Sequence, residues 1–184
     1  LNDRCLLWSA GPPMLPSAYN NNFIIMQTPG LVTIYIEMIH DFRMIPVDGR
    51  DHIPSSIPQW HGNSRGHWDG DTLVVTTRNI RKTEANAAAV GGDPVILRVA
   101  NGSEEDTITV TERFTRVDES TVHYEFTIED PTHWTSDWTG EFPFVALPED
   151  ELLYEYACHE GNYSMTNILG GERELERQGR TNQQ

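Results

Sequence analysis

The fold is decided by the stretch SRGHWDGDTLVVTT, which covers residues 64–77. Two strand-like runs, Ser64–Trp68 and Thr72–Thr77, flank the turn residues Asp69-Gly70-Asp71. An Asp-Gly pair between two such runs is the strongest short-range signal for a β-hairpin, because glycine adopts the positive φ that a tight turn needs. The stretch therefore predicts two antiparallel strands.

Short strand-like runs separated by turn signals recur along the rest of the chain. Thr28-Pro29-Gly30 is typical of a type II turn, because proline presets φ at the first central position and glycine tolerates positive φ at the second. The expected strands are Phe23–Gln27, Leu31–Met44, Ser64–Trp68, Thr72–Thr77, Ile96–Val99, Thr107–Arg116, Thr121–Ile128, Thr135–Val145 and Leu152–Cys158. No helix of ordinary length alternates with them, which disfavours a parallel α/β sheet.

The sequence predicts an all-β fold in one domain. Meandering antiparallel strands of this number close into a barrel or fold into a sandwich, since open edges invite aggregation. Residues 1–22 hold three prolines and a run of asparagines and predict an irregular lead-in. Residues 23–169 are expected to form the β domain. Residues 170–184 predict a charged C-terminal tail with a short helix, and a further short helix is expected within 79–94.

The net charge of the chain limits the classes of partner that it is expected to bind. With 28 acidic and 13 basic residues among 184, the formal net charge is −15. A field of this sign repels phosphate backbones, so nucleic acid is not expected as a partner. The longest apolar run, Phe23–Met44, is interrupted by charged and polar residues. It cannot provide the ~20 apolar residues of a membrane helix, so no transmembrane segment is expected.

Two cysteines, Cys5 and Cys158, lie near opposite ends of the chain. A bridge between them would close a loop of about 150 residues, for which the chain-entropy model gives roughly 4–5 kcal/mol. The alternative is two separate buried thiols that pack as small apolar groups. The chain begins at Leu1 rather than Met, which suggests a processed product. Processing and a disulfide together favour an oxidising compartment.

Several segments carry a family resemblance. They are His40–Arg43, Asp48–Arg50, Gly62–Val75, Thr111–Asp118, Asp130–Pro131, Trp134–Thr135 and Tyr154–Asn162. Together they resemble an uncharacterised family of exported bacterial β-rich proteins, over most of the chain from about Asp3 to Gly170. The segment Gly66–Val74 is also similar to bacterial lipocalin-like (calycin) domains. The resemblance implies a β-barrel in a periplasmic or secreted bacterial protein, and it brings no catalytic residues.

Buried charge is the first chemical signal in the strands. If Leu31–Met44 is one strand, alternation places Tyr35, Glu37 and Arg43 on one face, and Ile34, Phe42 and Met44 on the other. A glutamate among apolar neighbours is costly unless it is paired. Glu37, Glu112 and Glu155 are therefore expected to meet Arg43, Arg65 or Arg113.

A catalytic reading uses these same groups. Histidine is the natural acid or base near neutral pH. His40 or His159, oriented by a carboxylate such as Glu37, would act as general base. Arg43 or Arg65 would then steady a developing oxyanion. No metal-binding motif of the CxxC, HExxH or HxH type occurs, and neither a phosphate-binding loop nor a dinucleotide fingerprint is present. The sequence predicts no metal and no cofactor.

Aromatic residues supply a second reading, since aromatic rings line many small-molecule pockets. The candidate ligand-binding residues are Tyr35, Trp60, Trp68, Tyr124, Trp134 and Tyr154. Three hypotheses stay open. The first is a binding protein that holds a small apolar or aromatic molecule in its interior. The second is a cofactor-free lyase, isomerase or hydrolase. The third is an accessory subunit that binds a larger envelope assembly through its Pro-rich N-terminus and charged tail.

Overall fold

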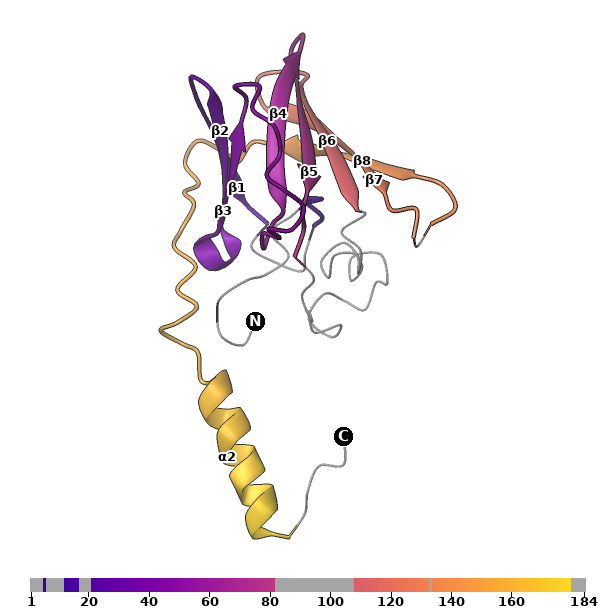
Figure 1. The fold of residues 1–184 in the computed structure, drawn as a ribbon. Helices are drawn as coiled ribbons and strands as arrows, with labels where there is room; N and C mark the ends of the chain where they lie inside the picture. The colour runs from indigo at the N-terminus through magenta and orange to yellow at the C-terminus, as the bar shows by residue number, and fades with distance from the viewer. Residues whose placement is uncertain (1–4, 6–11, 17–20, 82–107, 133, 180–184) are drawn as a thin grey trace.

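The computed structural model describes residues 5, 12–16, 21–81, 108–132 and 134–179. In this part of the chain, two antiparallel sheets form the body and one helix follows them (Figure 1). The three-stranded sheet has the order β1 (Phe23–Thr28), β2 (Leu31–Ile36), β3 (Phe42–Pro46). The five-stranded sheet has the order β4 (Asn63–Asp69), β5 (Thr72–Arg78), β6 (Thr109–Arg116), β7 (Thr121–Glu129), β8 (Trp138–Val145). A 3₁₀ turn, η2 (Met38–His40), and the C-terminal helix α2 (Ser164–Arg177) complete the described elements.

Tight hairpins join β1 to β2, β4 to β5 and β6 to β7, and all the described strand pairs are antiparallel, which confirms the predicted antiparallel β fold. Asp69 pairs with Thr72, so Gly70 and Asp71 alone form the loop between β4 and β5. Gly70 has a φ of +58°, and Gly30 in the first hairpin has a φ of +77°. Glycine adopts these values without the steric cost that a side chain would bring. Strand order follows chain order in both sheets, as expected for a meander.

The prediction of one long strand over Leu31–Met44 is wrong. The strand ends at Ile36, and η2 reverses the chain so that β3 runs antiparallel to β2. Because directly paired residues share a face, Arg43 lies on the inner face with its partner Ile34. Phe42 pairs with Tyr35 on the outer face. The predicted grouping of Phe42 and Met44 with Ile34 is therefore also wrong.

Some of the remaining strand predictions are confirmed and others are not. Segments near 107–116, 121–128 and 135–145 appear as β6, β7 and β8 with small shifts of their ends. Leu152–Cys158 was expected as a strand, but it pairs with none of the described strands and is irregular. The expected strand Ile96–Val99 lies outside the described residues, as does most of the helix expected within 79–94.

The core lies between the inner faces of the two sheets. Ile34 and Ile45 come from the three-stranded sheet, and Val75 and Val110 face them from the five-stranded sheet; all four are fully buried. Aromatic rings fill the rest of the space around Tyr124. At the other side of the body, the Phe23 ring on β1 meets the Phe144 ring on β8 edge-on, with centroids 4.6 Å apart.

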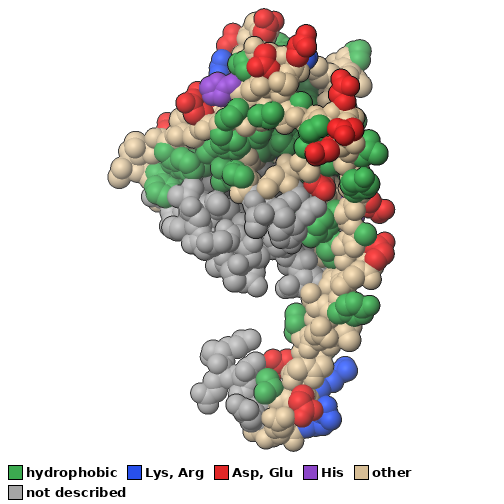
Figure 2. All heavy atoms as spheres, turned by 180° about the vertical axis from the view of Figure 1, so that it is seen from behind, with side chains coloured by type: hydrophobic (Ala, Val, Ile, Leu, Met, Phe, Trp, Pro, Cys, Tyr) green, Lys and Arg blue, Asp and Glu red, His purple; other side chains and the backbone are tan. Residues whose placement is uncertain are grey.

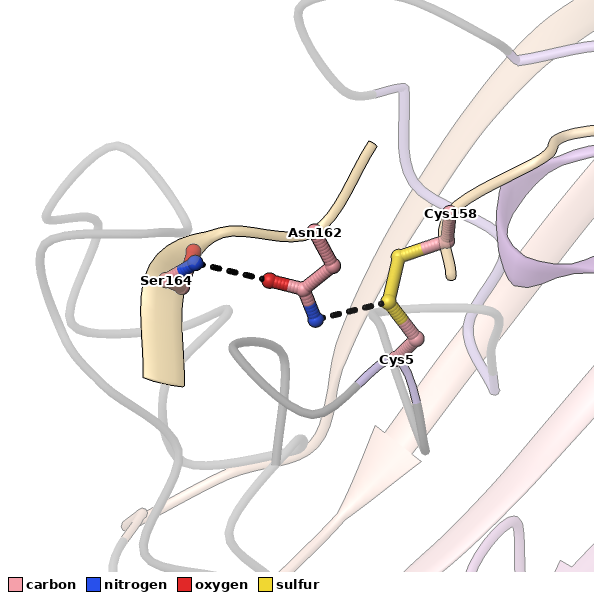
Figure 3. Close-up of a disulfide and its surroundings, with 4 residues drawn as sticks. All are labelled: Cys5, Cys158, Asn162 and Ser164. Carbon is pink, nitrogen blue, oxygen red and sulfur yellow. Dashed lines mark hydrogen bonds between the residues drawn. A yellow bond between two sulfur atoms is a disulfide. The ribbon is translucent and has the colours of Figure 1, made fainter. Parts of the chain in front are cut away.

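A disulfide joins Cys5 to Cys158, with the two Cα atoms 5.9 Å apart (Figure 3). The predicted bridge is thus confirmed. Asn162 donates a hydrogen bond from Nδ2 to Cys5 Sγ at 3.2 Å and accepts one from the Ser164 amide at 3.0 Å. The bridge therefore fixes the lead-in to the segment that precedes α2. None of the helices in the described part of the chain combines the length and apolarity needed to cross a bilayer.

Reduction of the Cys5–Cys158 bridge is expected to lower the free energy of unfolding by roughly 4–5 kcal/mol, since the reduced chain regains the entropy of a long open loop. Urea unfolding with and without reductant measures the difference. The variant Cys5→Ser/Cys158→Ser is the control, because it should match the reduced protein and no longer respond to reductant. Equal unfolding midpoints for oxidised and reduced protein would contradict the expectation.

Candidate functional site

A buried ion pair connects the two sheets. Arg43 extends from β3, and its Nη1 donates to Glu112 Oε1 on β6 at 3.0 Å. Its Nη2 donates to Glu112 Oε2 at 2.5 Å, which completes a bidentate pair. The two side chains are 1% and 0% exposed. This confirms the expectation that Glu112 meets an arginine, because an unpaired carboxylate in this core would be costly.

Further hydrogen bonds extend this pair into a network. Tyr124 on β7 donates its hydroxyl to Glu112 Oε1 at 2.8 Å. The same hydroxyl accepts the backbone amide of Met14 at 2.8 Å. On the other side, Arg43 approaches Ser64 Oγ at 3.5 Å, and Ser64 shares a 2.8 Å hydrogen bond with Thr77. The network thus connects Met14 of the N-terminal segment and both sheets through the buried Glu112 carboxylate and the Tyr124 hydroxyl.

The surroundings of Tyr124 and Arg43 raise the pKa of both groups. Burial raises the pKa of Tyr124 well above its usual range, and the neighbouring Glu112 charge raises it further. Burial alone would lower the pKa of Arg43, but the charge and hydrogen bonds of Glu112 outweigh it and the pKa is raised. Near neutral pH, Tyr124 therefore stays neutral and Arg43 stays charged. The arrangement suits holding the sheets together.

A pocket of about 1000 Å³ opens between β1 and the C-terminal end of β8, beside the β6–β7 turn. Its apolar walls come from both sheets and from the residues after β8: Phe23, Ile25, Trp68, Phe114, Phe144 and Leu147. Charged residues line it as well: Asp71 of the β4–β5 turn, Arg116 at the end of β6, and Asp118 and Glu119 of the β6–β7 turn. The volume lies within the range of small-molecule sites.

The back of the body exposes two kinds of side chain (Figure 2). Figure 2 shows hydrophobic side chains gathered in a band across the back of the body, with acidic side chains along its upper edge. Several apolar pocket residues are open to solvent, since Trp68 is 47% and Leu147 41% exposed. A small molecule with an apolar body would cover these groups.

The predicted catalytic residues contact different partners. Arg43 faces Glu112 in the core, and Glu37 accepts a hydrogen bond from Asn22 at 2.9 Å. Arg65 donates from Nε to the Asp51 carbonyl at 2.8 Å and from Nη1 to its neighbour's carbonyl. His40 is exposed on η2, and His159 is exposed before α2. None of the five lines the pocket described above.

The predicted ligand-binding residues are also dispersed. Of the six, all of which the structure describes, Trp68 lines the pocket and the others do not. Tyr124 is buried in the core, and Trp134 packs edge-on against Trp138. Trp60 carries Arg81 over its ring at 4.5 Å. Tyr35 lies on the outer face of the three-stranded sheet, and Tyr154 is 73% exposed.

Sequence reasoning missed most of the pocket wall. Phe142 and Phe144 alternate along β8, so this strand carries a period-two apolar signal that marks one inward face. Strand β1 begins with four consecutive apolar residues, Phe23–Met26, so its sequence does not distinguish its two faces. Neither pattern says that β1 and β8 approach one another, which depends on contacts far apart in sequence.

A histidine–carboxylate pair also forms outside the predicted set. His61 Nε2 lies within hydrogen-bond distance of Asp41 Oδ2, and the side chains are 15% and 23% exposed. Partial burial raises the pKa of Asp41, but the hydrogen bond and charge of His61 lower it more, so the net pKa is below the usual range. Asp41 thus stays ionised and orients the His61 ring near η2.

Comparisons with protein-family models, curated proteins and solved structures give no match to this chain.

Replacement of Glu112 by Gln is expected to lower the free energy of unfolding by about 3–5 kcal/mol, because the buried Arg43 charge loses its counter-charge. Chemical denaturation measures this change. Glu129→Gln at the exposed end of β7 is the matched control and should change stability little. The double variant Arg43→Met/Glu112→Leu should lose less free energy of unfolding than Glu112→Gln does. A harmless Glu112→Gln would refute the role assigned to the pair.

The contribution of Tyr124 to stability is expected to decline in alkali. Its folded pKa is raised, so the folded state keeps a proton that the unfolded state loses above the ordinary tyrosine pKa of about 10. The stability advantage of the wild type over Tyr124→Phe should therefore be constant below that pH. Above it, the advantage should shrink by about 1.4 kcal/mol per pH unit. Urea unfolding of both proteins at several pH values between about pH 8 and about pH 11 tests this. A constant difference would contradict it.

Proposed function

We propose that this chain is an exported bacterial protein that binds a small apolar or aromatic molecule in the pocket between β1 and β8. The observation that carries the proposal is the pocket itself, with a volume of about 1000 Å³ and aromatic walls from both sheets. The lining combines apolar side chains with many polar and charged ones, and the volume of the pocket lies within the range of small-molecule sites. The contacts of Arg43 and Arg65 favour binding over an oxyanion-stabilising role for either arginine.

The proposed fold is a barrel left open between β1 and β8. Support comes from the meander order of the strands and from the contact of Phe23 with Phe144, which brings the two outermost strands together. In a barrel of this kind, the lumen is lined by alternate residues of each strand. Here the middle of the interior is filled by the Tyr124 network, so the ligand is proposed to occupy the open end.

The proposed location is the periplasm or the cell exterior. The Cys5–Cys158 disulfide supports this, because such bonds persist in oxidising compartments. The resemblance to exported bacterial proteins points the same way. Fractionation of the source cell, with antibody detection of the chain, tests the assignment, and recovery from the cytoplasm with both thiols reduced would overturn it.

Binding is expected to depend on the inner face of β1. Phenylnaphthylamine, a neutral aromatic dye that fluoresces in apolar surroundings, serves as the probe. Ile25 lines the pocket and is 36% exposed, so Ile25→Trp fills the pocket without displacing core atoms. This substitution should weaken dye binding at least ~10-fold, equivalent to about 1.4 kcal/mol. Fluorescence titration measures the dissociation constants.

The neighbouring residue provides the matched control. Met26 lies on the same strand with its side chain on the opposite face, 45% exposed. Met26→Trp adds the same ring outside the pocket and should leave the dissociation constant within about two-fold of the wild type. Equal loss in both variants, or no dye binding by the wild-type protein, would overturn the proposed function.

A second candidate function is that of a subunit in a larger assembly. The outer face of the three-stranded sheet favours it, because Ile24, Met26, Phe42 and Met44 are each between 45% and 59% exposed there. Exposed apolar patches of this kind mark contact surfaces. Native mass spectrometry of protein from its source should then show a heavier complex. Phe42→Asp/Met44→Asp should abolish that complex and leave dye binding intact, whereas a monomeric wild-type protein would exclude this function.

A further inference from the structure

The mouth of the pocket carries an unbalanced set of charges. Three carboxylates line it, Asp71 from the β4–β5 turn and Asp118 with Glu119 from the β6–β7 turn. Arg116 is the one cation among the described lining residues. A ligand that enters the pocket therefore passes more negative than positive groups.

The single arginine is already engaged with the protein backbone. Arg116 Nε donates to the Asp118 carbonyl at 3.0 Å, and Nη2 donates to the Glu119 carbonyl at 3.0 Å. These two bonds hold the β6–β7 turn in shape and direct the guanidinium fork toward the turn. An anionic ligand would have to compete with them for the same N–H groups.

The three carboxylates are exposed to solvent. Asp118 Oδ1 accepts hydrogen bonds from the amide of Ser120 at 2.8 Å and from its hydroxyl at 3.0 Å. These bonds lower the pKa of Asp118. Asp71 and Glu119 form no ion pair with any residue that the structure describes, and Arg116 is the one cation that shares the described pocket lining with the three carboxylates. The formal net charge of −15 adds a long-range attraction for cations.

The apolar walls suit the same class of ligand. Phe23, Trp68 and Phe144 line the pocket, and the faces of aromatic rings attract cations. On these observations we propose that the pocket selects cationic ligands, in which a small apolar or aromatic body carries a protonated amine that lies against Asp71 and the β6–β7 turn. This inference rests on the proposed function and names the chemical class that the pocket takes.

Three probes with one ring system and different charges test the inference. Naphthylmethylammonium is a cation, naphthylmethanol is neutral and naphthoate is an anion at neutral pH. Each competes with phenylnaphthylamine in a fluorescence titration of the full chain. The cation should bind at least ~10-fold tighter than the anion at low salt, with the alcohol between them. Its advantage should shrink at high salt, because exposed charges are screened.

Matched variants locate the source of the preference. Asp71→Asn keeps a residue suited to the turn and removes one carboxylate from the mouth, so the ratio of anion to cation dissociation constants should fall by about two- to three-fold. Glu176→Gln on α2 removes the same charge from an exposed position outside the pocket lining. It should leave the ratio unchanged, which separates a local effect from net charge.

The outcomes distinguish the inference from the proposed function. A cation preference that Asp71→Asn reduces and Glu176→Gln preserves supports the inference. Equal binding of the three probes, tighter binding of naphthoate, or equal effects of the two variants overturns the inference while the pocket remains a binding site. If the wild type binds neither the dye nor any probe, the proposed function fails and the inference fails with it.

Discussion

The ion pair between Arg43 and Glu112 is the constraint on which the rest of the structure depends. Both side chains are almost fully buried, and neither charge could be left alone in the core without a cost of several kcal/mol, by the order of magnitude for buried ions. Since Arg43 lies on β3 and Glu112 on β6, pairing them requires the two sheets to face one another. Apolar packing alone would allow one sheet to slide over the other, whereas a bidentate ion pair fixes the position of one sheet relative to the other.

This constraint also decides where a ligand can go. Tyr124 donates a further hydrogen bond to Glu112. Its ring packs among Phe114, Phe142 and Phe144 in the centre of the body. The middle of the interior is therefore full. The pocket lies at one end of the body, where two turns of the five-stranded sheet approach β1. The charged turns and the apolar walls meet there because of this geometry.

Local signals in the sequence were sufficient for the hairpins, and they indicated that Glu112 meets one of three arginines without saying which. The Asp-Gly and Pro-Gly turns depend on neighbouring residues only, and a glutamate among apolar neighbours is costly unless it is paired. The turn at η2 was not predictable in this way. Ile39 and His40 have φ of +59° and +47° there, in a region that non-glycine residues rarely adopt and that tertiary packing imposes. The pocket was missed for a related reason, since it needs β1 and β8 to meet across more than half of the chain.

Strand β1 has a double role that follows from its place at the sheet edge. Its inner residues Phe23 and Ile25 line the pocket, and its outer residues Ile24 and Met26 belong to the exposed apolar face. Among the described strands, β2 alone is hydrogen-bonded to β1, and β1 contacts β8 through side-chain packing such as that of Phe23 on Phe144. A ligand in the pocket would add contacts on both sides of this junction. The same contacts would fix the outer face of β1, so the two candidate functions act on one strand and need not exclude each other.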